Sequence, residues 1–233
     1  THASAWHMDL GGDVRSLMSV EPNQRWWETT HHELGHIYYY LAYARPEVPP
    51  ILRAGANRGY HEAVGTLLGN ASVQKPFLVA KGLIADGGAT DEVQALLKEA
   101  LNAIVFLPFG SGTMTHFERD LYAGLPVGEY NRRWWHHVRT FQGIEPPAER
   151  GEEYCDAASK THISDDPAQY YDYAFASVLK YQLHDRISRE ILGVDPHRAN
   201  YYGRSEVGDF LRSILDKGAT EDWRGLIREA TGE

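Results

Sequence analysis

A long helical pattern near the amino end constrains the fold of this chain more than any other feature. It runs over about residues 23–44, with apolar residues returning at helical spacing. Pro22 stands where the first turn of a helix tolerates proline. Pro46, Pro49 and Pro50 cannot continue a helix. We therefore expect one long helix that ends before Pro46.

Helical patterns also dominate the rest of the sequence. A second helix is expected to start near Tyr60, after a loop at residues 53–59. Thr90, followed by two acidic residues, is a good amino-terminal cap for a helix that reaches about residue 106. Periodicity indicates further helices at about residues 115–123, 127–141, 170–192, 205–217 and 220–229.

The one convincing strand signal lies within residues 5–18. Apolar residues there flank Gly11 and Gly12, and glycine supplies the positive φ that tight turns require. Residues 143–167 carry loop signals, and no domain boundary stands out. The sequence predicts a mainly α fold with one short β-hairpin near the amino end. Residues 1–233 are expected to belong to a single domain, without an internal boundary.

Composition excludes several classes of partner. The formal net charge of −9 and the lack of a Lys/Arg cluster argue against a nucleic-acid partner, because phosphate binding needs a basic surface. The apolar run at residues 103–109 is far shorter than the roughly 20 residues that span a bilayer. We therefore expect no transmembrane segment. Cys155 is the single cysteine, which excludes an internal disulfide.

The long helix carries the pattern H-E-x-x-H at residues 32–36. His32 and His36 are four residues apart, so both imidazoles lie on one helical face and can reach one metal ion. Glu33 then points at the water on that ion, as a general base would. This donor set suits zinc.

Catalytic zinc takes three protein ligands, so a third is required. Tyr39 and Ala42 occupy the positions where a metzincin would have glycine and histidine, which excludes that subclass. Glu62, at the start of the next helix, is the expected third ligand. His61 is the rival, although a supporting role beside the metal is the better interpretation for it. The aromatic residues at 26–27, 38–40 and 134–135 could form a substrate wall, but aromatic residues at such spacings are more often in the core, and we expect them there.

Two segments carry a resemblance to a known family. Residues 31–37, His-His-Glu-Leu-Gly-His-Ile, resemble the metal motif of the angiotensin-converting enzyme family of zinc peptidyl-dipeptidases, which are gluzincins. Residues 55–65 resemble its third-ligand segment. Similar segments follow in order along nearly the whole chain, at residues 2–6, 106–109, 134–135, 142–143, 154–156 and 181–184.

The resemblance implies a helical fold with a deep cleft, of which this chain looks like the carboxy-terminal catalytic portion, bacterial-type, without the amino-terminal part. It implies zinc held by His32, His36 and Glu62. Glu33 would take a proton from the attacking water and pass it to the departing amine.

The resemblance also implies groups that handle the substrate. His162 and Tyr173 match the residues that stabilise the oxyanion. Lys160 and Tyr170 match groups that hold the terminal carboxylate of a peptide, which places the cut two residues from its end. The positions that align the peptide as an extended strand match His2 and Ala3.

Some positions depart from the family pattern. Asp172 and Val138 stand where members that respond to chloride have arginines, which argues against chloride activation. Thr66 replaces an acidic residue after the third-ligand motif. Thr1 and Ser19 stand where relatives have a disulfide pair.

The resulting hypothesis is a zinc peptidyl-dipeptidase, or a close carboxypeptidase, acting on short peptides in a periplasmic or extracellular location. The alternative is a non-catalytic zinc-bearing half-cleft or binding module that needs the missing amino-terminal part. A helical structural protein with a fortuitous motif is the third interpretation, and the ordered resemblance argues against it.

Overall fold

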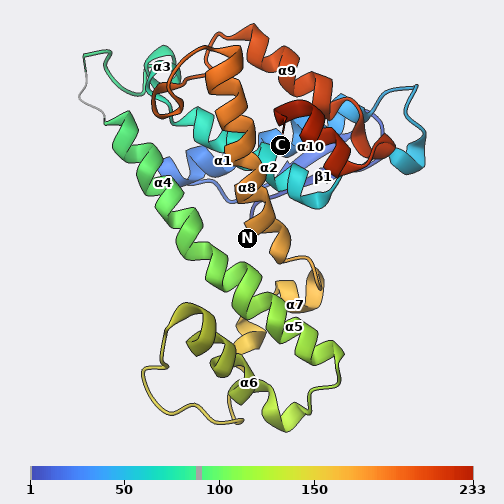
Figure 1. Ribbon diagram of the computed structural model, residues 1–233, viewed down its shortest axis with the longest axis vertical. Coiled ribbons are helices and arrows are strands. Elements are labelled where there is room, and N and C mark those ends of the chain that lie inside the picture. The colour runs from blue at the N-terminus through green and yellow to red at the C-terminus, as the bar shows by residue number, and fades with distance from the viewer. Residues whose placement is uncertain (1, 88–90, 233) are drawn as a thin grey trace. The chain divides into compact units, whose positions relative to one another are not determined.

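The computed structural model describes residues 2–87 and 91–232 of the chain (Figure 1). Thr1, one of the two positions matched to a disulfide pair in relatives, and Thr90, the expected helix cap, lie outside the described residues. The chain forms two compact units, which are described separately. The first unit comprises Thr1–Leu96 and Ala176–Glu233, and the second comprises Leu97–Phe175. The predicted mainly α fold is confirmed.

Helices make up most of the first unit. Its elements are β1 (Ser4–His7), β2 (Val14–Leu17), α1 (Gln24–Tyr43), η1 (Pro50–Leu52), α2 (Arg58–Ser72), α3 (Lys75–Ala80), η6 (Ile187–Ile191), η7 (Pro196–Arg198), α9 (Ser205–Leu215), η8 (Gly218–Thr220) and α10 (Trp223–Thr231). The boundaries between the units fall inside α4 (Glu92–Leu107) and α8 (Tyr171–Arg186).

The long helix predicted at residues 23–44 is α1. Asn23 caps it, since its side chain accepts a hydrogen bond of 2.9 Å from the Trp26 backbone N–H. Pro22 precedes this cap and lies outside the helix. The helix ends at Tyr43, before the prolines. It packs chiefly on α2, which Asn57 caps in the same way through the Gly59 N–H at 2.7 Å.

The predicted hairpin is present and packs on α1. β1 and β2 pair antiparallel, with Ser4 opposite Leu17 and His7 opposite Val14. The Tyr40 hydroxyl on α1 donates to the Ala5 carbonyl at 3.2 Å. This bond holds the strand against the helix that carries the H-E-x-x-H pattern.

Residues distant in sequence close the core of the first unit. Tyr60 on α2 is fully buried and donates its hydroxyl to the Trp223 carbonyl at 2.8 Å. The buried apolar residues of α9 and α10 contribute to the same core: Val207, Leu211, Ile214, Leu215, Leu226 and Ile227. Burying one such side chain contributes roughly 1.5–3 kcal/mol, so this packing supports α1 and α2.

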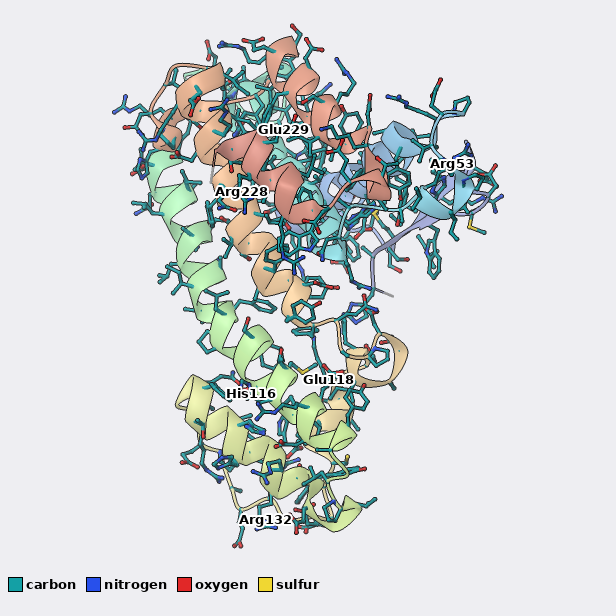
Figure 2. The ribbon with its side chains drawn as sticks, turned by 45° about the vertical axis from the view of Figure 1, so that its right-hand side comes forward. Arg53, His116, Glu118, Arg132, Arg228 and Glu229 are labelled. Atoms are coloured by element: carbon teal, nitrogen blue, oxygen red, sulfur yellow. The ribbon has the colours of Figure 1, made fainter. Side chains whose placement is uncertain are left out.

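The second unit forms around an aromatic cluster. Its elements are η2 (Pro108–Met114), α5 (Thr115–Tyr122), η3 (Val127–Glu129), α6 (Tyr130–His137), η4 (Val138–Gln142), η5 (Asp156–Ser159) and α7 (His162–Asp165). Met114, Phe117 and Trp134 are at the centre of the cluster. Figure 2 shows His116 and Glu118 on α5 and Arg132 on α6. Glu118 accepts a hydrogen bond of 2.7 Å from the Ala168 N–H, which secures the loop before α8.

Two features differ from the sequence expectation. Helices 90–106 and 115–123 were expected to be separate, but the wide π turn η2 joins α4 to α5 in one helical run (Figure 1). Pro108 has no N–H to donate to the carbonyl four residues before it, and the run continues there through the wider π turn. The expected loop at 143–167 contains η5 and α7.

That joined run, Glu92–Tyr122, is long and apolar enough to cross a membrane by length and composition, and it is the one such helix in the described residues. Its residues Leu97, Leu101, Ile104 and Val105 are more than half exposed. A single helix of this kind is weak evidence for a span, and the expectation of no transmembrane segment stays a prediction.

Candidate metal centre

The two histidines of the H-E-x-x-H pattern converge on one point. Because they lie one helical turn apart on the side of α1 that faces α2, their rings meet edge to face with centroids 4.7 Å apart. The two Nε2 atoms are 3.1 Å apart. His36 is buried, and His32 is partly exposed on the same face.

Glu62 reaches the same point from α2. Its Oε2 lies 3.4 Å from His32 Nε2 and 3.9 Å from His36 Nε2. Glycines allow this approach: a Cβ at Gly35 would lie 2.7 Å from the Cα of Gly65, closer than real Cβ contacts come. The two helix backbones therefore touch where the three side chains meet.

The donor set fits zinc. A tetrahedral ion with bonds of about 2.0–2.1 Å holds its ligand atoms about 3.3 Å apart, close to the separations of 3.1, 3.4 and 3.9 Å found here. A Cβ at Gly65 would lie 2.9 Å from the His32 ring, so only glycine leaves room for that ligand. His32, His36 and Glu62 could therefore hold the metal.

The electrostatics favour the metal-binding protonation states of His36 and Glu62 but not that of His32. Burial lowers the pKa of His36 to about 4, which keeps its imidazole neutral. Burial alone would raise the pKa of Glu62, but the hydrogen bond from His32 and the nearby imidazoles outweigh it, so this pKa is lowered. Burial opposes the charge of His32, yet the same hydrogen bond and the nearby carboxylates raise its pKa. A proton held between His32 and Glu62 therefore competes with the metal.

Glu33, the expected general base, lies beside the ligands. It is buried on α1. Burial raises the pKa of its carboxyl, and the charge of Glu62 adds to the effect. Perturbed carboxyls of this kind cluster at functional sites.

His61, the rival ligand, lies outside the group of three. Its ring packs against Tyr39 at 4.3 Å between centroids, and its Nε2 is 3.2 Å from the Tyr43 hydroxyl. Burial lowers its pKa to about 3. His61 is therefore neutral, and its ring lies beside that of His36, with centroids 5.5 Å apart, so a supporting role beside the metal stays a prediction. The charge of Arg58, which the sequence did not single out, lowers the pKa of both His36 and His61 from the first turn of α2.

A cavity of about 640 Å³ opens beside the metal centre. His2 and Ala3, the expected peptide-aligning residues, border it together with His32 and Glu33. Trp26, which was expected in the core, also lines this cavity. The spacing of aromatic residues along a helix does not tell whether a side chain lines a cavity or packs in the core.

The four remaining predicted residues lie together in the second unit. The Tyr173 hydroxyl is 3.5 Å from His162 Nε2. Tyr170 contacts the His162 ring edge on, with centroids 5.0 Å apart, and Lys160 Nζ lies 4.7 Å above the Tyr170 ring. Val138, at a position expected to bind chloride in some relatives, is a buried residue of the aromatic cluster.

The fold and the donor set together define a class. A mainly helical chain with H-E-x-x-H on one helix and a glutamate on the next has the centre of a gluzincin metallopeptidase. Residues 1–233 match peptidase family M2, angiotensin-converting enzyme. The chain belongs to this family.

Its relatives are substantially longer. It is 31% identical to an angiotensin-converting enzyme of Theromyzon tessulatum, with 99% of the chain matching 38% of that protein. It is 33% identical to an angiotensin-converting enzyme-related protein of Drosophila melanogaster, where all of the chain matches 38%. It is 35% identical to an angiotensin-converting enzyme of Mesocricetus auratus, where 99% of the chain matches 18%. The chain therefore spans well under half the length of these relatives.

Proposed function

We propose that this chain carries the catalytic metal centre of a zinc peptidase that releases dipeptides from the free carboxy terminus of short peptides. The observation that carries the proposal is the cluster of His32, His36 and Glu62, with Glu33 on the same helix, in a member of the angiotensin-converting enzyme family.

Glu33 moves the protons in this proposal. Bound zinc would supply a Lewis acid that polarises the scissile carbonyl and brings the pKa of water at the site to roughly 7. Glu33 accepts the proton of the attacking water and delivers it to the departing amine. Its raised pKa supports this role, because a carboxyl that is protonated more readily both takes and holds a proton closer to neutral pH.

His162 and Tyr173 stabilise the negative charge that develops on the carbonyl oxygen. Two facts support this role. Both residues match the family pattern, and the tyrosine hydroxyl and the imidazole nitrogen are within hydrogen-bonding range of each other. Both groups can donate to an oxyanion.

Lys160 and Tyr170 bind the carboxylate at the end of the peptide. The ammonium group above the Tyr170 ring and the phenol hydroxyl offer a charge and a donor for that carboxylate. His2 and Ala3 align the peptide beside the hairpin, which is consistent with their place at the cavity beside Glu33. The substrates are therefore short peptides with a free carboxy terminus.

The matched relatives are much longer than residues 1–233, and we propose that an amino-terminal portion of the family fold completes the cleft as the partner of these residues. We also propose a periplasmic or extracellular location, on the family resemblance.

Hydrolysis of an amino-blocked tripeptide with a free carboxylate tests the proposal. With zinc added, the chain is expected to release a dipeptide. Glu33→Gln keeps the shape of the side chain and the ligand set but removes the base, so its hydrolysis should cease while zinc binding persists. The same tripeptide with an amidated carboxy terminus is the matched control and should be cleaved poorly. A zinc-loaded chain that cleaves neither peptide would contradict the proposal and favour the non-catalytic half-cleft.

A further inference from the structure

Thr66 lies at the edge of His32 that faces away from the ligand cluster. Glu62 and Thr66 are four residues apart on α2, so both side chains lie on the face that meets α1. Glu62 Oε2 is 3.4 Å from Nε2 of the His32 ring. The Thr66 hydroxyl oxygen is 3.5 Å from Nδ1 of the same ring. Residues of one helix thus contact both ring nitrogens of His32.

The ring is confined on its face as well. A Cβ at Gly65 would lie 2.9, 3.0 and 3.1 Å from three atoms of the His32 ring, so the ring lies flat on the backbone of α2. A Cβ at Gly69 would lie 3.6 Å from the His32 Cβ. The backbone sets the plane of the imidazole, but it does not decide which nitrogen carries the proton.

Metal binding requires that the proton of the neutral His32 ring be on one particular nitrogen. An imidazole that binds a metal through Nε2 carries its proton on Nδ1, and the group that accepts this proton sets the tautomer and the ring orientation. A threonine hydroxyl can accept it. A hydroxyl is neutral, so it strengthens the ligand less than a carboxylate at the same position would.

We propose that Thr66 is a positioning residue of the metal centre: its hydroxyl accepts the Nδ1–H of His32 and directs Nε2 toward the metal. This inference rests on the proposed function, because it requires that His32 bind zinc. It adds that the site holds zinc less tightly than it would with a carboxylate at residue 66.

Zinc affinity, measured by competition with a chromogenic chelator, tests the inference without any peptide. Thr66→Val preserves the shape and removes the hydroxyl, and it should weaken zinc binding by about 10-fold or more, the range seen when such supporting groups are removed. Thr66→Ser restores a hydroxyl and should bind within about threefold of the native chain. Thr66→Asp should bind more tightly, and Thr66→Asn, which lacks the charge, should not.

Thr30→Val is the matched control. It removes a hydroxyl from α1 that donates to the Trp26 carbonyl at 2.7 Å, and this bond does not involve the ligands. Its zinc affinity should equal that of the native chain. In the zinc-loaded protein, the Nδ1–H resonance of His32 should be protected from exchange, and Thr66→Val should remove that protection.

The outcomes separate the two proposals. Equal zinc affinities for the native chain and Thr66→Val, or a Thr66→Ser variant as weak as Thr66→Val, would overturn the positioning role and leave the metal centre standing. A native chain that binds no zinc would overturn both. If the chain binds zinc and the Thr66 variants change zinc affinity as expected, but no peptide is cleaved, the positioning role is supported and the peptidase proposal is refuted.

Discussion

The contact between Gly35 and Gly65 predicts that a side chain at residue 35 destabilises the fold. In Gly35→Ala, the new Cβ would lie 2.7 Å from the Gly65 Cα and 3.1 Å from the Val64 carbonyl oxygen. Carbon atoms in ordinary contact are about 3.5–4.0 Å apart, so α1 and α2 must separate by about 1 Å. Overpacking of this kind costs typically about 1–3 kcal/mol, and the upper part applies because both obstacles are backbone atoms.

Helix propensity opposes this cost. Replacing glycine by alanine inside a helix gains about 1 kcal/mol. The net destabilisation expected for Gly35→Ala is therefore about 2 kcal/mol. The separation also moves Glu62 relative to the histidines by more than the roughly 0.2 Å that a metal–ligand distance tolerates. Zinc affinity should therefore fall together with stability.

Gly225→Ala is the control. Gly225 lies in α10, is exposed and has nothing near the position of a Cβ. This variant should gain up to about 1 kcal/mol and should bind zinc normally. Urea unfolding of the metal-free proteins and zinc titration measure both quantities. If Gly35→Ala is as stable as Gly225→Ala, or binds zinc as tightly, the close approach of the two helices does not govern the site.

Three further perturbations have expected outcomes. Burial lowers the pKa of His36 to about 4 and that of His61 to about 3. In the unfolded chain the pKa of histidine is about 6.5, so below that pH the unfolded chain binds protons that these two histidines do not bind in the folded chain. Stability of the metal-free chain should fall as the pH drops from about 7 to 5, and His61→Gln should reduce this slope in urea unfolding; a flat native profile would refute the assignment. Glu62→Ala should weaken zinc binding by more than about 100-fold in a chelator competition, and an unchanged affinity would remove Glu62 as the third ligand. Tyr173→Phe should lower the kcat of tripeptide hydrolysis by about 10²–10³-fold with zinc affinity unchanged, whereas an effect on KM alone would contradict its role at the oxyanion.

The local parts of this structure could be predicted from the sequence. The extent of α1 followed from apolar periodicity and from the prolines beyond it, which act within a few residues, whereas the Asn23 cap was found only in the structure. The pairing of His32 with His36 followed from the helical repeat alone. The hairpin lies where the apolar runs around Gly11 and Gly12 predicted it, but the expected reason was wrong, because the positive φ in this turn belongs to Leu10 (55°) and to neither glycine.

Boundaries that depend on packing were less accurate. The wide turn η2 and the short helix α7 were not predicted, because the aromatic cluster of the second unit holds segments that carry no periodic signal of their own. The start of α10 lies at Trp223, after the Asp222 cap, and three residues later than the pattern indicated.

Chemical identity and spacing along one helix are properties of the chain, and so the residues able to bind a metal could be named before their positions were known. The orientation of those residues depends on a second helix. Gly35 and Gly65 let α2 approach, which brings Glu62 to one ring nitrogen of His32 and Thr66 to the other, while the same packing leaves His61 among tyrosines. No periodicity encodes these contacts, because they depend on the distance between two backbones that the chain joins only through a loop.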